Sequence, residues 1–141
     1  MAQEAESPLA QRHTVPSNRQ IAVMIKSAVV AFNHANLTGN YSVLRDLAAP
    51  SFRDQNSSAS LAEIFQKLRK RKVDLGPIIL YQPKLPRKPW INQRGLLRVV
   101  GFFATRPEQV NFNLAYTMVG NRWALFSIGI TTSHPKAIPG G

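Results

Sequence analysis

The stretch FNHANLTGNYSVLRDLAAPSF, residues 32–52, decides the fold. It is typical of the end of one helix, a break at Gly39 and Asn40, a short second helix at residues 41–49 and an exit at Pro50. Gly39 tolerates the left-handed backbone that ends many helices, and a proline disfavours helical backbone at the residue before it. With a further helix and then strands after it, the segment predicts a small α+β domain.

A long amphipathic helix is predicted before this stretch. Ser17 and Gln20 match a capping box, and apolar residues then recur at helical spacing up to the break. Residues 51–59 are rich in Ser, Asn and Asp, and they predict a loop. Ser60 and Glu63 match another capping box, which predicts a third helix with a basic last turn.

The period of the apolar residues changes after Gly76 and Pro77 from that of a helix to that of strands. Four strands are predicted, at residues 78–85, 96–105, 109–119 and 122–132. The third alternates apolar and polar side chains, and Gly120 with Asn121 fits a two-residue hairpin turn after it. We therefore expect an α+β fold in which three N-terminal helices pack on a strongly curved, mainly antiparallel four-stranded sheet that forms a cone.

The chain has 141 residues, 44% of them apolar, which suits one domain with a real core. We expect a disordered segment at residues 1–16, the domain at residues 17–132 and a flexible tail at residues 133–141.

Cysteine is absent, so disulfides and thiolate chemistry are excluded. No apolar run approaches the ~20 residues of a membrane span, so no transmembrane segment is expected. The first residues lack the apolar core of a signal peptide yet look like the start of a mature exported protein, so exported, periplasmic and cytoplasmic locations stay open.

Three segments resemble the nuclear transport factor 2-like superfamily, which includes SnoaL-like proteins and has a cystatin-like α+β cone. Residues 33–44 resemble its helix, small polar turn, aromatic and leucine, and residues 50–52 resemble the segment that enters its cavity. Trp123 with Phe126 resembles a Trp-x-x-aromatic motif of its last strands. The likeness covers residues 17–132, is similar to that of uncharacterised bacterial members, and implies the cone fold. Likeness at the level of fold does not transfer an activity.

Residues that carry acid–base chemistry are scarce in the predicted strands. After Asp74 the only carboxylate is Glu108 and the only histidine is His134. Enzymes that resemble this fold place a carboxylate or a His/Asp pair inside the cone, whereas this sheet supplies no such base. The remaining catalytic candidates are His34, Tyr41 and Asp54. The sequence contains no motif with the spacing of metal ligands and no cofactor-binding motif, so we expect no metal and no cofactor. We also expect a non-enzymatic protein. The alternative is a SnoaL-like or ketosteroid isomerase-like enzyme that acts on a small hydrophobic substrate.

The predicted cone has an apolar lining. Its wall residues are Phe32, Leu44, Phe52, Phe65, Leu80, Phe102, Phe112, Tyr116, Phe126 and Ile130. Such walls suit a small apolar ligand, and the alternative is that these side chains fill the cone as core. The choice between Phe102 and Phe103 is open, because both faces of that strand are apolar. The leading expectation is a non-enzymatic module for small apolar ligand binding or protein assembly.

A homodimer is predicted from the fourth strand. Trp123 and Leu125 fall out of phase with Phe126 and Ile128, which places them on the outer face of the sheet. Large apolar residues on an outer face indicate a partner surface. Members of the superfamily that this chain resembles commonly dimerise through that face.

A net charge of +11 also predicts an anionic partner. Residues 67–98 hold ten basic side chains and a single acidic one, Asp74. The centre of this predicted basic patch is Lys67, Arg69, Lys70, Arg71, Lys72, Arg87 and Lys88. Such a patch attracts nucleic acid, anionic lipid or an acidic protein, and the alternative is a solvated helix end followed by a basic loop. An anionic-surface binder is therefore a second alternative function.

Overall fold

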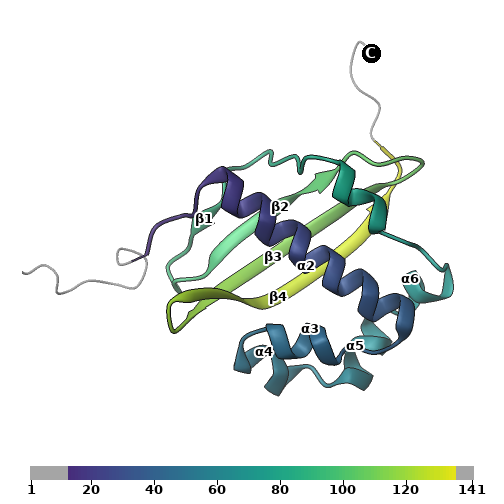
Figure 1. The fold of residues 1–141 in the computed structure, drawn as a ribbon, viewed down its shortest axis with the longest axis horizontal. Coiled ribbons are helices and arrows are strands. Elements are labelled where there is room, and N and C mark those ends of the chain that lie inside the picture. The colour runs from purple at the N-terminus through teal and green to yellow at the C-terminus, as the bar shows by residue number, and fades with distance from the viewer. Residues whose placement is uncertain (1–12, 136–141) are drawn as a thin grey trace, which may run out of the picture.

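One long helix lies across a four-stranded antiparallel sheet in the computed structural model, which describes residues 13–135 (Figure 1). The predicted α+β class is confirmed. In chain order the elements are α2 (Asn18–Thr38), α3 (Ser42–Leu47), α4 (Pro50–Gln55), α5 (Ser58–Ile64), α6 (Gln66–Lys70), the 3-10 helix η1 (Gly76–Leu80), β1 (Trp90–Ile91), β2 (Leu97–Phe103), β3 (Gln109–Val119) and β4 (Arg122–Ser133). The strands are ordered β1-β2-β3-β4 in the sheet. Most of the predicted segment 1–16 and of the predicted tail 133–141 lies outside the described residues, although Ser133 ends β4.

The long helix α2 has the start and the end that the sequence predicts. The Ser17 hydroxyl accepts a hydrogen bond from the Gln20 N–H (3.2 Å), and Gly39 follows the last turn with a φ of 75°. Its buried apolar face consists of Ile21, Ile25, Val29, Phe32 and Ala35. By length and mean hydropathy (1.2) α2 meets the criteria for a membrane-spanning helix, against the prediction that no such segment exists. A core helix meets the same criteria, and the apolar face of α2 packs in the core.

Four short helices follow α2 where two helices and a loop are predicted. Pro50 begins α4 instead of ending the preceding helix, because a proline in the first turn loses no helical hydrogen bond. The predicted loop after it therefore holds most of α4 and the start of α5. The Ser57 hydroxyl caps α5 by accepting from the Ser60 N–H (3.1 Å), so the predicted cap at Ser60 is wrong by three residues. Phe65 separates α5 from α6 and packs edge-on against Phe32, with ring centroids 4.5 Å apart.

The predicted first strand, residues 78–85, is wrong. Most of its first half belongs to η1, and Lys84 pairs with the sheet through an isolated bridge to Phe102. The strand at this edge is instead the two-residue β1. Prolines explain the difference, because each one removes a backbone donor that a strand needs. Pro83 lies within the predicted strand, and Pro77, Pro86 and Pro89 flank it.

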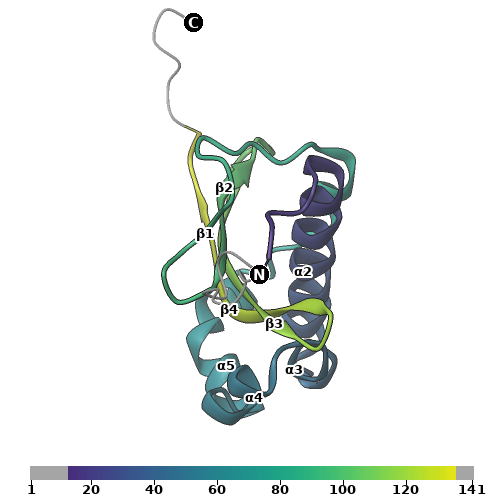
Figure 2. The same ribbon diagram turned by 90° about the vertical axis from the view of Figure 1, so that its left-hand side faces the viewer.

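The sheet is not strongly curled, so the predicted cone is wrong (Figure 2). Helix α2 covers one face of the sheet, and most of the opposite face, which we call the outer face, carries no helix. The predicted third strand matches β3 at both ends, and its alternate residues Phe112, Leu114 and Tyr116 are buried toward α2. The Tyr116 hydroxyl donates to the backbone oxygen of Met24 on α2 (3.1 Å), which ties the helix to the sheet.

A β-bulge in β4 changes which side chains face α2. Ala115 pairs with Ser127, but the next residue of β3, Tyr116, pairs with Leu125. Phe126 is therefore left without a partner. Because side chains alternate along a strand, one extra residue reverses the facing of everything beyond it.

The bulge overturns the predicted outer-face placement of Trp123 and Leu125. Both side chains lie on the α2 side of the sheet, where Leu125 is buried and Trp123 packs against the core. Phe126, predicted to line the cavity, lies on the outer face instead. The homodimer prediction thereby loses the observation that carried it.

Candidate functional site

The three predicted catalytic candidates do not come together. His34 is exposed on α2, and Asp54 is exposed on α4. Tyr41 is fully buried next to the start of α3, where its hydroxyl donates to the side-chain oxygen of Asn36 (2.6 Å). Burial raises the pKa of Tyr41, and the nearby Arg69 offsets only part of that effect. Within residues 13–135, no hydrogen bond or ion pair joins any two of the three candidates.

Seven of the ten predicted pocket residues belong to one packed cluster between α2 and the sheet. They are Phe32, Leu44, Phe52, Phe65, Phe112, Tyr116 and Ile130. Leu80 is 87% exposed, because η1 replaces the strand that would have turned it inward. Phe103 takes the inward position predicted for Phe102, since it pairs with Val110 on the buried face of β3. Phe126 does not line the predicted cavity, because the bulge places its side chain on the outer face.

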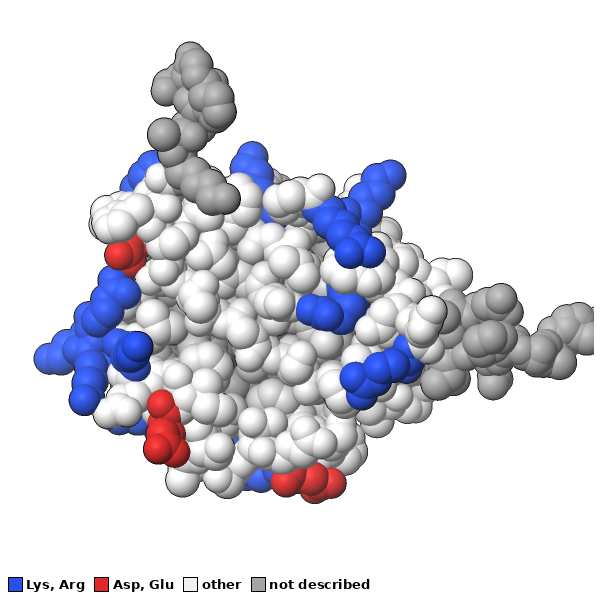
Figure 3. Space-filling view, turned by 180° about the vertical axis from the view of Figure 1, so that it is seen from behind, with Lys and Arg blue, Asp and Glu red and all other residues white. Residues whose placement is uncertain are grey.

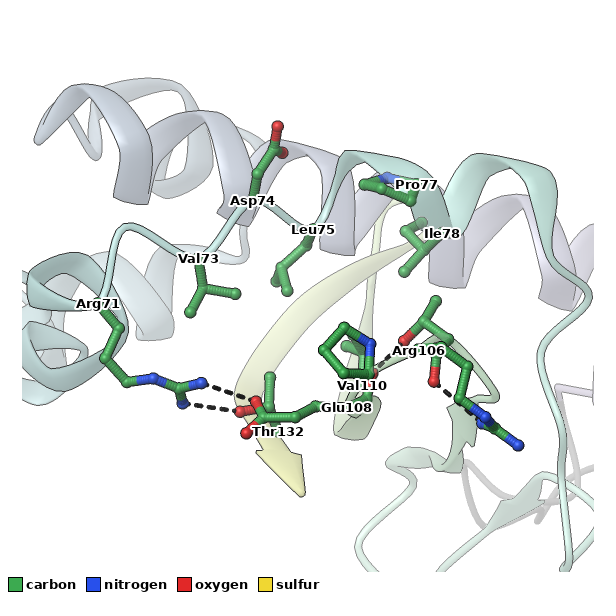
Figure 4. A pocket seen from close by; sticks show the side chains of 12 residues that line it. Arg71, Val73, Asp74, Leu75, Pro77, Ile78, Arg106, Glu108, Val110 and Thr132 are labelled. Atoms are coloured by element: carbon green, nitrogen blue, oxygen red, sulfur yellow. Dashed lines mark hydrogen bonds and ion pairs between the residues drawn. The ribbon is translucent and has the colours of Figure 1, made fainter. Parts of the chain in front are cut away.

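A cavity of about 290 Å³ lies at the end of the sheet where β2 turns into β3 (Figure 4). We call it the turn-end pocket; its lining is Arg71, Val73, Asp74, Leu75, Pro77, Ile78, Thr105, Arg106, Pro107, Glu108, Val110 and Thr132. Leu75, Ile78 and Val110 are buried and form its floor, and Val73 is half-buried beside them. Figure 4 shows these apolar side chains pointing into a common space. The pocket therefore offers an apolar interior.

An ion pair is held at the rim of the turn-end pocket. Arg71 donates from Nη1 to the Thr132 hydroxyl (3.1 Å) and from Nη2 to Glu108 Oε1 (2.7 Å). The Arg71 guanidinium holds the pKa of Glu108 below its usual range. The Thr105 hydroxyl donates to the backbone oxygen of Glu108 (2.6 Å), which braces the turn. Arg106 turns away from the pocket and donates to backbone oxygens of its own segment (Figure 4).

A buried asparagine fixes the wall opposite β3. Asn33 on α2 is 3% exposed; its amide donates to Asp74 Oδ1 (2.9 Å), and its side-chain oxygen accepts from the Leu75 N–H (2.8 Å). The same carboxylate oxygen of Asp74 accepts from the Gly76 N–H (2.8 Å). The Gly76 N–H, and then the Asn33 amide, lower the pKa of Asp74. The wall is thus anchored to the core helix before any ligand arrives.

Sequence reasoning missed the turn-end pocket because its lining comes from segments far apart in the chain. The sequence pattern assigned Arg71 to a basic patch and gave Glu108 no role. Two signals were present, however. Glu108 is the only carboxylic side chain after Asp74 in a strongly basic chain, so a cationic partner is expected for it. Asn33 sits among the apolar positions of an amphipathic helix, and a buried amide needs partners.

The predicted basic patch is divided between the two ends of the molecule. Lys67 and Lys72 delimit a group of five exposed basic residues on and just after α6, at one end of Figure 1. Arg87 and Lys88 are also exposed, but they precede β1 at the other end. Figure 3, which views the outer face, shows Lys and Arg gathered toward both ends with a broad uncharged area between them.

Comparisons of the chain with protein-family models, with curated proteins and with solved structures find no match in any of the three. The resemblance to the nuclear transport factor 2-like superfamily therefore stays a prediction.

Proposed function

We propose that the chain is a non-enzymatic module that binds a small apolar ligand in the turn-end pocket. The observation that carries this proposal is a preformed cavity of about 290 Å³ with buried apolar walls and a fixed polar rim. Ligand pockets in proteins combine apolar walls with a few placed polar groups in this way. The volume of this pocket lies just below the usual range for ligand pockets, roughly 300–1,000 Å³, so the ligand is small.

The rim favours a ligand with one hydrogen-bond acceptor. A guanidinium has five N–H donors, and the contacts of Arg71 to Thr132 and Glu108 use two of them. Arg71 can therefore donate to an acceptor on the ligand without leaving its place. The net charge of +11 adds long-range attraction for a ligand whose acceptor is anionic, such as a carboxylate. A short-chain carboxylic acid, with its chain against Val73 and Val110, has this chemistry.

Acid–base catalysis at this site is disfavoured by its electrostatics. A general base works best when its pKa lies near the working pH. Glu108 is the rim carboxylate, and its contact with Arg71 lowers its pKa, which moves it farther from neutral pH. The N–H groups that donate to Asp74 lower the pKa of that carboxyl group in the same way. Both groups are poor proton acceptors at neutral pH, so the enzyme alternative has no base here.

The proposal is tested by ¹H–¹⁵N NMR titration with hexanoic acid and with hexanol. Both probes should give saturable shifts at the amides of Leu75 and Val110, and the acid should bind more tightly because of Arg71. Val73→Trp places a larger side chain in the cavity and should abolish the shifts. Val43→Trp, at an exposed position of α3 that is outside this pocket, is the matched control and should leave them unchanged.

Arg71→Gln keeps the apolar walls, so it provides a second variant if Val73→Trp does not fold. It should remove the preference for the acid and retain weak binding of the alcohol. Titration curves that Val73→Trp leaves unaltered would contradict the proposal. So would shifts centred on the separate apolar groove between α2 and Trp123.

A further inference from the structure

We propose that the outer face of the sheet binds single-stranded nucleic acid through stacked aromatic and arginine side chains near β1. The register places Trp90 opposite Arg98 and Arg98 opposite Ala115. All three therefore lie on the face away from α2, because Tyr116, the next residue of β3, faces α2. This proposal concerns a different surface from the turn-end pocket and stands independently of it.

Aromatic rings on this face lie beside guanidinium groups. The Arg87 guanidinium carbon lies 3.4 Å from the centre of the Trp90 ring, and that of Arg98 lies 5.6 Å from the same ring. Arg94 lies 5.7 Å from the centre of the Phe126 ring. Unpaired bases stack on aromatic rings and on arginine planes alike. The face thus offers a row of flat groups, with Phe102 half-buried on the same face farther along β2.

A hollow beside these rings supplies polar groups for base edges. It has a volume of about 330 Å³, and its lining includes Asn92, Arg94, Arg98, Asn113 and Phe126. Arg98 donates to the side-chain oxygen of Asn113, which orients the amide. The Asn92 side-chain oxygen accepts from two backbone N–H groups of its own turn, which leaves its NH₂ group for a ligand. Amide side chains of this kind pair with the edges of exposed bases.

Among the described residues, no ion pair involves the basic side chains of this region. Within residues 13–135 the only carboxylate after Asp74 is Glu108, and it is paired with Arg71 at the turn-end pocket. Arg87, Lys88 and Arg94 are therefore left to attract phosphate groups. In Figure 3 their end of the molecule is rich in basic side chains, while the middle of the face is uncharged.

Single-stranded nucleic acid fits this surface better than an anionic membrane does. Membrane-binding surfaces insert protruding apolar groups into the bilayer, with lysines and arginines beside them. Here the rings of Trp90 and Phe126 are half-buried, and the cations beside them are arginines, whose planar groups suit stacking. A duplex hides the faces of its bases, so stacking selects single strands.

The experiment is fluorescence anisotropy of labelled dT15 titrated with the full chain at several salt concentrations. We expect saturable binding whose logarithmic affinity falls linearly with the logarithm of salt concentration. Trp90→Ala and Phe126→Ala should each weaken binding at least about fivefold, the lower end of the loss of one base–aromatic stack. Circular dichroism shows whether each variant stays folded.

Two double variants separate this site from general attraction by charge. Arg94→Gln with Arg98→Gln removes two cations from the outer face and should weaken binding and flatten the salt dependence. Lys67→Gln with Lys70→Gln removes two cations from α6 and should have a much smaller effect. Equal losses from both double variants would overturn the proposal, as would equal affinity for duplex DNA. Binding to vesicles of phosphatidylserine and phosphatidylcholine without any binding to dT15 would assign the face to membranes instead.

Discussion

Replacing Asn33 by alanine should destabilise the fold more than its small size suggests. Within residues 13–135, it is the only residue of α2 that hydrogen-bonds to the wall segment at Asp74 and Leu75, once as donor and once as acceptor. The variant would leave the Leu75 N–H without its acceptor in the core, since Leu75 is 3% exposed. A buried donor left unpaired costs about 1–3 kcal/mol.

The second contribution to the loss of stability in Asn33→Ala comes from the Asp74 carboxylate. Asp74 loses one donor but is exposed, so water replaces most of that bond, and the loss adds at most about 1 kcal/mol. The two contributions together predict that Asn33→Ala lowers the free energy of unfolding by about 1–4 kcal/mol, measured by urea denaturation at pH 7. Asp74→Ala is the matched control, because it keeps the bond between Asn33 and Leu75 and should cost less.

The dependence on pH gives an independent check. The pKa of Asp74 is lowered in the folded state, so its ionised form contributes stability above the pKa of the unfolded chain. That contribution is lost as the pH falls through the folded-state pKa, and the difference between wild type and Asp74→Ala should shrink below about pH 4. A loss below about 1 kcal/mol in Asn33→Ala, or one no larger than in Asp74→Ala, would refute the reasoning.

Two further predictions concern the sheet and are read by the same urea denaturation. A methyl group at Gly101 would overlap the backbone oxygen of Lys84, so Gly101→Ala should cost about 2 kcal/mol or more. In Gly129→Ala the nearest atom would be 3.7 Å away, and the cost should stay below about 1 kcal/mol; equal costs would contradict this contrast. Tyr116→Phe removes the donor to the Met24 backbone oxygen and should cost about 1 kcal/mol, whereas unchanged stability would show that this bond contributes nothing net.

The parts of the fold that follow local rules were predictable from the sequence. Helix α2 has a serine cap, a regular apolar stripe and a terminal Gly39, and all three signals are local. Strand β3 alternates without interruption, and the Gly120 turn fixes where β4 begins. In each case the periodicity of the apolar residues and the signals at the ends of the element predict the same secondary structure, and tertiary contacts do not change it.

The remaining elements depend on contacts that a local pattern does not contain. Pro50 can end one helix or begin the next, and the sequence does not distinguish these roles. Residues 78–85 have the apolar side chains of a strand, but Pro83 removes a donor, and the segment holds only the end of η1 and a single bridge to the sheet. The turn-end pocket is harder still, because Arg71 and Glu108 meet only after the whole sheet has formed.

The bulge at Phe126 links the core to the proposed nucleic-acid surface. Trp123 and Ile128 are five positions apart, and side chains an odd number of positions apart point to opposite faces of a regular strand. Both side chains face α2 because the bulge adds one residue between them. Core packing therefore accounts for the outward position of Phe126 by itself. It does not account for Arg94 beside that ring, since Arg94 is exposed and belongs to no core contact. The decisive experiment is thus the comparison of the paired arginine and lysine variants, and loss of the Phe126 ring alone would not separate packing from binding.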